Sequence, residues 1–458
     1  MLTKQQHATF ELRDVPVSDP WDTIRRGSRL VSRRVGLIRQ IAESAFQAQD
    51  PAIFTTGLRL ADFSQAVPDG RMLSASGASD SAAGALVAAI GEAAERHAAC
   101  FFDRDEMVLG TSRELAEDAA SPDALRLFSR EQVERLGLRN LTYFDEQTRI
   151  RWVWGHSLAD GRPRLVPAAY VYLNYRPEPD EAWIGYTSST GLAAGATREE
   201  AILGALLETV ERDAFTLAWM HRRPGRRLEI NHDELRRTMS LRLRVPHPSV
   251  DLQFFDLTTD IPIPVVFAIM RRQAEMGPVV CQGLASRVSP TVAVRKCIHE
   301  AGQNFPFIRN LLSGERNWHP AEDFTNVSTF DHHFLTYLKR PDLVRRAFAF
   351  FDQCEDRASL STLPDHATGR VLGDIDYCVS QLRKAGYEAI VVDVTAPDIA
   401  EVGLSVVRVI VPGLVPLHSH HLRPFLGVRR LFEAAQRLGW NQNGHGDHGL
   451  NSMPHPFP

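Results

Sequence analysis

Cysteine is scarce in this sequence of 458 residues. Its five cysteines form no Cys-x-x-Cys pair and no closely spaced pair, which argues against a structural zinc site and against a disulfide framework. We expect buried, reduced thiols and a cytoplasmic protein. The cysteines are Cys100, Cys281, Cys297, Cys354 and Cys378.

Long hydrophobic runs and an excess of positive charge are also lacking. The longest apolar runs, Ile261–Met270 and Val406–Leu417, are too short to span a bilayer, and the N-terminus lacks the pattern of a secretory signal. A formal net charge of -4 gives no electrostatic case for binding nucleic acid or an anionic membrane. No Walker A sequence is present. We therefore expect neither a nucleic-acid partner nor a membrane partner.

A charged cluster occurs twice, first as Glu92-Ala-Ala-Glu95-Arg96 and again as Glu208-Thr-Val-Glu211-Arg212. In a helix, residues three and four positions apart share a face, so each segment directs two carboxylates and one guanidinium to one patch. Small apolar residues surround both clusters, and buried carboxylates require cations or dense hydrogen bonding. Carboxylates suit Mg²⁺ completed by phosphate oxygens. Two solvated helix faces remain the alternative.

Each cluster follows a stretch of small residues, Ser74–Ser81 and Ser188–Gly195, which we interpret as a turn before a helix. Ser79, Asp80 or Ser81 is expected to cap the first helix. The N–H groups at such helix starts suit phosphate, although ordinary helix capping explains either turn alone.

A third unit has the same order of elements. Strands at Ile263–Met270 and Val279–Ala285 precede a helix that Ser289-Pro290 opens and Pro306 is expected to limit. One face of this helix is polar and carries Lys296, Glu300, Gln303 and Asn304. We expect this face to belong to the site, and a solvent-exposed helix face is the alternative.

Periodicity predicts the remaining elements. We expect helices at 21–47 and 422–438, a mostly helical region at 310–385, and strands at 141–145, 150–157, 165–173, 389–394 and 406–411.

The C-terminal region combines a linker with a stiff end. Residues 441–450 have the composition of a flexible linker, and their Gly-x-Gly-x-x-Gly pattern lacks the strand and helix that a dinucleotide site needs. Pro454-His-Pro-Phe-Pro458 is stiff and extended, and it suits delivery of a carboxylate to a defined place. A frayed terminus or a ligand for another domain is the alternative. Local histidine density is weak support for a metal site at His418, His420, His421, His445 and His448.

From about Ser74 onward the chain resembles the YcaO family. The two Glu-x-x-Glu-Arg clusters appear in order with Ser188–Gly195 before the second, followed by Gly283–Ser286, by Glu300 and Gln303, and by two further motifs. These are Asp393-Val-Thr-x-Pro397 and Val407-x-Val-Ile-Val-Pro-Gly413. The chain departs from many members at Ala88, where they have Ser, and in Ser76-Gly-Ala-Ser79, where they have Lys.

The resemblance implies an α+β YcaO-type fold with internally repeated sheet-and-helix units around a Mg-ATP site. Periodicity and composition predict an N-terminal helical segment at 1–70 and a flexible tail at 441–458, and the resemblance implies a catalytic domain between them at 71–440. ATP and Mg²⁺ are the implied cofactors. The implied metal ligands are Glu92, Glu95, Glu208, Glu211 and Glu300, and the implied nucleotide-binding residues are Ser79, Glu92, Arg96, Glu208, Arg212, Glu300 and Gln303.

The proline-rich end resembles that of family members that form azoline rings, which implies catalytic roles for Pro454, Pro456 and Pro458. The implied activity is ATP-dependent cyclodehydration of Cys, Ser or Thr in a ribosomally made precursor peptide. The implied partners are that peptide and a separate leader-binding, ThiF-like, zinc-containing protein. Thioamide or amidine formation and a non-catalytic scaffold are the alternatives. A flavin-dependent dehydrogenase and a homodimer stay open.

Overall fold

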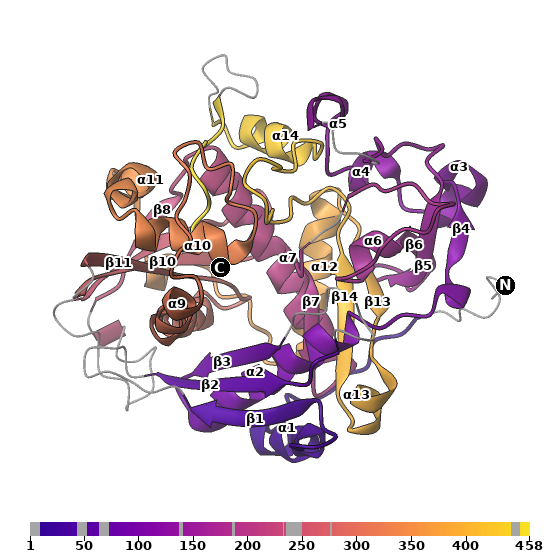
Figure 1. Cartoon of the computed structure of the whole chain (residues 1–458), viewed down its shortest axis with the longest axis horizontal. Coiled ribbons are helices and arrows are strands. Elements are labelled where there is room, and N and C mark those ends of the chain that lie inside the picture. The colour runs from indigo at the N-terminus through magenta and orange to yellow at the C-terminus, as the bar shows by residue number, and fades with distance from the viewer. Residues whose placement is uncertain are drawn as a thin grey trace.

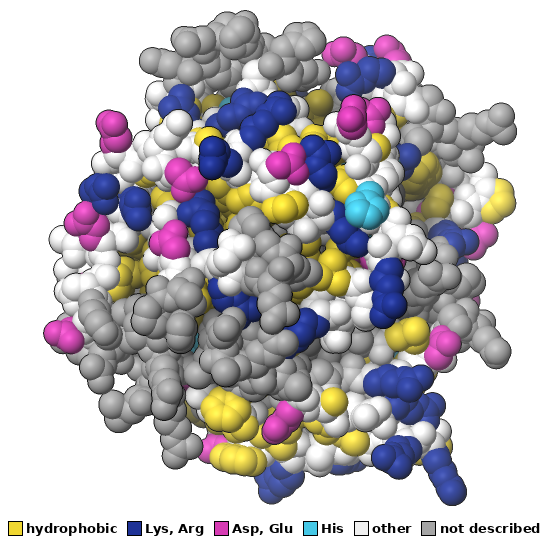
Figure 2. All heavy atoms as spheres, turned by 60° about the vertical axis from the view of Figure 1, so that its left-hand side comes forward, with side chains coloured by type: hydrophobic (Ala, Val, Ile, Leu, Met, Phe, Trp, Pro, Cys, Tyr) yellow, Lys and Arg dark blue, Asp and Glu magenta, His cyan; other side chains and the backbone are white. Residues whose placement is uncertain are grey.

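The computed structural model describes residues 10–43, 53–63, 73–136, 141–185, 188–231, 233–234, 250–274, 277–440 and 449–458. Figure 1 shows three sheets arranged around the long helix α7 (Arg198–Met220). Within these ranges, no helix combines the length and the apolar character that crossing a bilayer requires. On the face shown in Figure 2, Lys and Arg side chains lie among Asp and Glu side chains, and several more Lys and Arg side chains gather at the lower right.

The smallest sheet is antiparallel and carries the first glutamate helix, α2 (Ala82–Ala98). Helix α2 packs against β3 and β2, and helix α1 (Pro20–Gly27) packs against α2. The sheet has the order β1 (Ile38–Glu43), β2 (Phe54–Leu60) and β3 (Ser74–Ser79).

The predicted helix at 21–47, and with it a helical N-terminal segment, is wrong. Helix α1 ends at Gly27, and Ile38–Glu43 pairs with β2 as a strand. Gly36 lies in a turn so tight that a Cβ there would be 2.4 Å from the Leu30 carbonyl oxygen. This turn and strand pairing overrule the helical spacing of apolar residues.

A six-stranded sheet packs against α7 through the strands β7 and β14. The strand order is β4-β5-β13-β14-β7, and β6 pairs with β5. The strands are β4 (Val108–Gly110), β5 (Ile150–Ser157), β6 (Pro163–Pro167), β7 (Leu192–Gly195), β13 (Ile390–Asp393) and β14 (Ser405–Ile410). The associated helices are α3 (Ser112–Leu115), α4 (Pro122–Leu125), α5 (Arg130–Leu136), α6 (Ala168–Val171), α12 (Val371–Lys384), α13 (Pro397–Glu401) and α14 (Arg430–Arg437).

A five-stranded sheet of order β11-β10-β9-β8-β12 carries the third glutamate helix, α9 (Pro290–Gly314). Helix α9 packs against β11 and β10 and also touches β3. The strands are β8 (Arg226–Glu229), β9 (Val250–Asp256), β10 (Val265–Ala274), β11 (Gly277–Ser286) and β12 (Arg357–Ser359), and the remaining helices are α10 (Phe330–Lys339) and α11 (Asp342–Asp352).

Most of the predicted strands are confirmed, β5 over its full predicted range. The strand predicted at 165–173 gives way to α6 after Pro167, and that at 141–145 is reduced to a single bridge between Leu141 and Trp183. The region 310–385 is mostly helical, as predicted, but α9 continues through Pro306 to Gly314. The helix predicted at 422–438 is shorter, at Arg430–Arg437.

The first small-residue stretch forms strand β3 over Ser74–Ser79 rather than a turn, whereas the second is a turn around Thr190 and Gly191, as predicted, followed by strand β7. Gly77 in β3 lies so close to α2 that a Cβ added there would be 2.3 Å from the Ala85 carbonyl oxygen. A Cβ added at Gly195 in β7 would be 2.5 Å from the Ala201 nitrogen of α7. A Cβ added at Gly283 in β11 would be 2.0 Å from the Cys297 carbonyl oxygen of α9. Small residues thus let a strand lie directly against the following glutamate helix, and this strand-helix unit occurs three times.

We expect Gly283→Ala to lower the free energy of unfolding by about 3 kcal/mol, because the added methyl overlaps the main chain of α9. Gly314→Ala is the matched control, since a Cβ there meets nothing within 4 Å. Urea denaturation of both variants measures the difference. Equal stability of the two would contradict the close strand-helix approach.

Candidate functional site

Five glutamates on α2, α7 and α9 lie close together, Glu211 buried and the other four partly buried. Glu208 on α7 lies within electrostatic reach of Glu95 on α2 and of Glu300 on α9. Glu211 in turn interacts with both Glu208 and Glu300. Figure 1 shows the three helices approaching one another near the centre of the molecule. The structure therefore brings together all the carboxylates of the three predicted units.

Each glutamate accepts a hydrogen bond from a backbone N–H of a neighbouring strand or loop. Ser76 N in β3 donates to Glu92, and Ala194 N in β7 donates to Glu95 at 2.8 Å. The remaining donors are Gly191 N to Glu208 at 3.2 Å, Ser286 N to Glu211 at 3.0 Å and Leu284 N to Glu300 at 3.3 Å.

These bonds fix the orientation of each carboxylate. Two of them cross between repeats, because a strand before α7 holds a glutamate of α2, and the strand before α9 holds a glutamate of α7. The three units thus interlock around the carboxylates.

The two arginines of the clusters lie beside the glutamates. Arg96 Nη2 is 2.6 Å from Glu92 Oε1. Arg212 Nε lies 3.6 Å from Glu208 Oε1 and 3.5 Å from Glu211 Oε1, without a hydrogen-bond partner among the described residues. Lys296 is 3.6 Å from Glu300. Arg212 therefore retains hydrogen-bonding capacity in the buried site.

Burial disfavours the charged form of these carboxyl groups, and repulsion between neighbouring glutamates adds to the effect. Burial, with added repulsion from Glu208 and Glu92, raises the pKa of Glu95 to about 8. Burial likewise raises the pKa of Glu211 to about 8, with Glu300 and Glu208 adding to the rise that Arg212 opposes. Burial also raises the pKa of Glu208. A divalent cation would remove this repulsion, and a donor set made only of carboxylate oxygens fits Mg²⁺.

The C-terminal segment packs beside this region. Gln282 donates to the Pro456 carbonyl oxygen, and Tyr337 donates to the Pro454 carbonyl oxygen. The Phe457 ring lies edge-on to Phe215 at 4.6 Å and 5.7 Å from the Arg212 guanidinium carbon. Residues Met453–Phe457 are buried.

The docking of 449–458 contradicts both a flexible tail over this stretch and a frayed terminus. The prolines have no N–H that would need an acceptor. The carbonyl oxygens of Pro456 and Pro454 accept hydrogen bonds from side chains on β11 and α10. Of the predicted linker at 441–450, residues 441–448, which include His445 and His448, lie outside the described residues.

A family model described as YcaO cyclodehydratase, ATP- and Mg²⁺-binding, matches residues 76–415. The chain belongs to the YcaO family. ATP and Mg²⁺ are accordingly its cofactors. This agrees with the carboxylate oxygens gathered at the site and with the cofactors expected from the sequence.

Solved structures have the same fold. A heterocyclase in complex with substrate and cofactor has a TM-score of 0.78 at 23% identity over 100% of this chain and 60% of its own length. YcaO from Methanopyrus kandleri bound with AMPPCP and Mg²⁺ has a TM-score of 0.61 at 21% identity, covering 89% of this chain and 94% of that one. These likenesses confirm the expected mixed α and β YcaO fold.

Curated relatives are uncharacterised. A protein from Methanothermobacter thermautotrophicus is 28% identical over 59% of this chain and 67% of its own length. A Rhizobium leguminosarum bv. trifolii protein from the tfuA 3' region is 29% identical over 61% of this chain and 64% of its own length. The chain thus spans about two thirds of these relatives and 60% of the heterocyclase.

Two further predicted site residues, Gln303 and Ser79, lie at different distances from the glutamates. Gln303 Nε2 donates to Ser76 Oγ at 2.7 Å, so it joins the strand that holds Glu92. Ser79 lies at the end of β3, where its hydroxyl contacts Asp80 at 3.3 Å, while Ser81 caps α2. Ser79 is thus at the helix start rather than among the glutamates, and its nucleotide contact stays a prediction.

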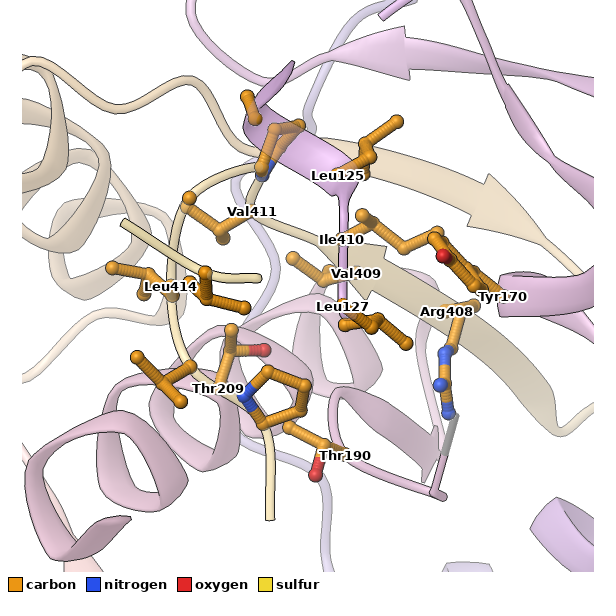
Figure 3. A pocket seen from close by; sticks show the side chains of 16 residues that line it. Leu125, Leu127, Tyr170, Thr190, Thr209, Arg408, Val409, Ile410, Val411 and Leu414 are labelled. Atoms are coloured by element: carbon orange, nitrogen blue, oxygen red, sulfur yellow. The ribbon is translucent and has the colours of Figure 1, made fainter. Parts of the chain in front are cut away.

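Arg408 was not predicted as a site residue. This β14 side chain is 1% exposed and interacts with Glu208, and its pKa is lowered to about 10 by burial, which Glu208 opposes. It donates to the Ser188 carbonyl oxygen at 2.6 Å, and its Nε and Nη1 have no partner among the described residues. It lines a cavity of about 60 Å³ with Thr190 and Thr209 (Figure 3), too small for a nucleotide. The sequence feature that could have indicated Arg408 as a site residue is a single arginine within an otherwise apolar strand.

The raised carboxyl pKa values predict a pH-dependent stability in the absence of Mg²⁺. The folded protein retains protons on Glu95 and Glu211 up to about pH 8, whereas the unfolded chain releases them near pH 4.5. The folded state thus binds more protons in this window, and stability falls as pH rises. We expect urea denaturation of metal-free protein to give a lower stability at about pH 8.5 than at about pH 7.

Saturating Mg²⁺ with a non-hydrolysable ATP analogue should remove most of this pH dependence, because the ion takes the place of the protons. Glu211→Gln should reduce the slope without metal. An identical slope in the variant and the parent would show that these carboxyls are not the titrating groups.

Proposed function

We propose that this YcaO protein is an ATP-dependent peptide cyclodehydratase that converts Cys, Ser or Thr residues of a ribosomally made precursor peptide to thiazolines or oxazolines. The observation that carries the proposal is the convergence of five glutamates from three helices next to a docked, proline-rich segment. The family description and the fold shared with heterocyclases support it.

Glu92, Glu95, Glu208, Glu211 and Glu300 would hold Mg²⁺, and Arg96 and Arg212 would neutralise phosphate oxygens. When bound, Mg-ATP supplies the phosphoryl group that makes the amide oxygen of the peptide a good leaving group. The substrate's own side chain is the nucleophile. The work of the protein is therefore positioning and charge neutralisation.

The Pro454–Pro458 segment would form the wall beside the reacting amide. Tyr337 and Gln282 hold its carbonyl oxygens, and Phe457 packs between Phe215 and Arg212. We propose that Pro454 and Pro456 keep this wall stiff, and that a carboxylate at Pro458 orients or deprotonates the substrate. Such a carboxylate is an effective base only in a desolvated site.

The precursor peptide and a separate leader-binding, ThiF-like protein are the proposed partners. The chain resembles a component of the E. coli microcin synthetase McbBCD complex, with a TM-score of 0.58 to the structure that has pro-MccB17 bound. This likeness to part of a multi-protein synthetase favours a protein that acts with partners.

The test is mass spectrometry of the candidate precursor peptide after incubation with this protein, the leader-binding partner, ATP and Mg²⁺. We expect the loss of one water mass per ring with release of phosphate. Replacement of oxygen by sulfur would indicate a thioamide-forming enzyme instead. An unchanged peptide and no ATP turnover with all partners present would indicate a scaffold.

A further inference from the structure

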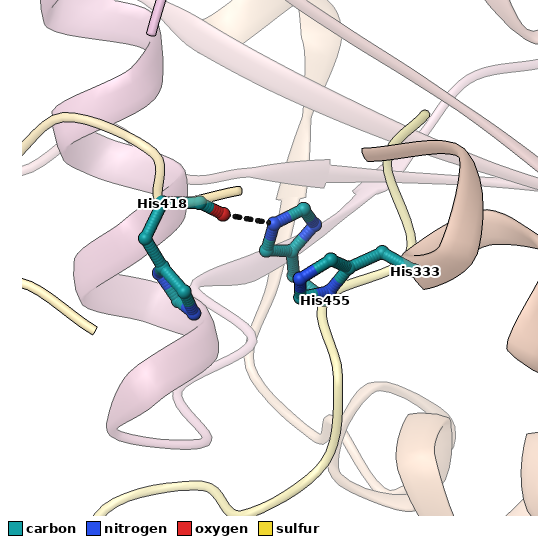
Figure 4. Close-up of side chains that lie close together, drawn as sticks. All are labelled: His333, His418 and His455. Carbon is teal, nitrogen blue, oxygen red and sulfur yellow. Dashed lines mark hydrogen bonds between the residues drawn. The ribbon is translucent and has the colours of Figure 1, made fainter. Parts of the chain in front are cut away.

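Three buried histidines from distant parts of the chain meet where the C-terminal segment docks. His333 comes from α10, His418 from the loop after β14, and His455 from between Pro454 and Pro456. One ring nitrogen of each lies within 4.8 Å of the others (Figure 4). The His333 and His455 rings are stacked with centroids 3.7 Å apart, and the His418 ring is 5.3 Å from that of His455.

The hydrogen bonds leave the cluster with unused ring nitrogens. Neither ring nitrogen of His333 makes a hydrogen bond of good geometry among the described residues, although the side chain is fully buried and has a polar interaction with the main chain of His455. His455 Nε2 donates to the His418 carbonyl oxygen at 2.7 Å. Its Nδ1 is therefore unprotonated, and it accepts only a 3.3 Å contact from Phe457 N.

This arrangement suits a metal better than simple packing. Burying an imidazole that makes no hydrogen bond of good geometry is unfavourable. A metal-ligating histidine usually donates its second N–H to a backbone carbonyl, which is the bond that His455 makes. Burial lowers the pKa of His418 to about 3 and also lowers those of His333 and His455, so all three are neutral, the form that binds metal.

We propose that His333, His418 and His455 bind one divalent transition-metal ion, for which Zn²⁺ is the best match, and that this ion fastens the C-terminal segment to the body of the protein. Three imidazoles with a fourth position for water or another ligand suit Zn²⁺. His421 is a candidate fourth ligand, because its Nδ1 is unpartnered and its ring is 6.0 Å from that of His333.

Binding requires one adjustment of the side chains. Two stacked, parallel rings cannot both direct a nitrogen at one ion, so the His333 or His455 ring must rotate about its second side-chain torsion. That torsion is broad for histidine. The ion would then hold the residue between Pro454 and Pro456, a consequence for catalysis that rests on the proposed function, whereas the metal site itself does not.

The probe is Co²⁺, whose four-coordinate complexes absorb visible light much more strongly than six-coordinate ones. Metal-stripped full-length protein is titrated in a large excess of Mg²⁺, which occupies the carboxylate site. We expect one Co²⁺ per chain with a four-coordinate spectrum, displaced by one equivalent of Zn²⁺. A weak six-coordinate spectrum, or no binding, in the wild-type protein would overturn the proposal.

Variants locate the site. His333→Phe keeps an aromatic ring in the stack and is expected to weaken Co²⁺ binding by about 100-fold or more, while His319→Phe at an exposed position is the matched control. Glu208→Gln/Glu211→Gln protein should keep the four-coordinate spectrum, which separates this site from the proposed Mg-ATP site. Unchanged binding in His333→Phe, or loss only in the glutamate variant, would contradict the assignment.

Discussion

Replacing Glu208 and Glu211 by glutamine is expected to lower ATP-dependent peptide modification by about 100-fold or more while leaving the protein folded. Both side chains are held by backbone N–H groups that an amide oxygen also satisfies, so the shape of the site is retained. What is lost is the negative charge that holds Mg²⁺, and with the ion the neutralisation of the nucleotide phosphates. Titration calorimetry with a non-hydrolysable ATP analogue should detect the loss directly.

In the absence of Mg²⁺ and above about pH 8, the same double variant should be more stable than the parent, since the parent must then bury charged, mutually repelling carboxylates. Thermal unfolding with and without metal measures both effects. Glu401→Gln, at a side chain that is 78% exposed, is the control and should behave like the parent. Full ATP turnover with unchanged Mg²⁺ dependence in the double variant would refute the nucleotide assignment.

Deletion of Pro454–Pro458 is the second large-effect prediction. It should abolish peptide modification while Mg²⁺-nucleotide binding persists, because the five glutamates take their hydrogen bonds from strands and a loop and not from this segment. Mass spectrometry of the peptide and calorimetry with the nucleotide analogue provide the two measurements. Modification that survives the deletion would remove the segment from the mechanism.

Point variants refine this test. Tyr337→Phe removes the donor to the Pro454 carbonyl oxygen and leaves the ring, so it should slow modification less than the deletion does. In a protein made to end at Pro458, adding one alanine after this residue moves the proposed carboxylate and leaves every proline in place. An unchanged rate in the extended protein would mean that the segment acts through its shape and not through a carboxylate.

The carboxylates of the site could be predicted from the sequence, because side-chain type and helical spacing both indicate them. Glu95 and Glu211 illustrate what could not be predicted. Their hydrogen-bond donors are the backbone N–H groups of Ala194 and Ser286, and any residue except proline offers such a group. No residue pattern can therefore reveal which strand holds which glutamate.

The errors in the fold have related causes. Ser74–Ser79 is rich in residues typical of turns, yet it forms β3, because Gly77 allows close contact with α2. The small residues of this stretch are explained by close packing between a strand and a helix, and not by a turn. Likewise, alternating prolines indicate a stiff segment without indicating where it docks, which depends on Tyr337 and Gln282 far away in the sequence.

The central claim is that the protein activates a backbone amide by transferring a phosphoryl group to its oxygen. The most direct test uses a substrate peptide labelled with ¹⁸O at the carbonyl that precedes the cyclised residue. After reaction with ATP in unlabelled water, mass spectrometry of the released phosphate should detect one ¹⁸O atom per ring formed. Unlabelled phosphate from a fully cyclised peptide would contradict the claim, because the amide oxygen would then have left by another route.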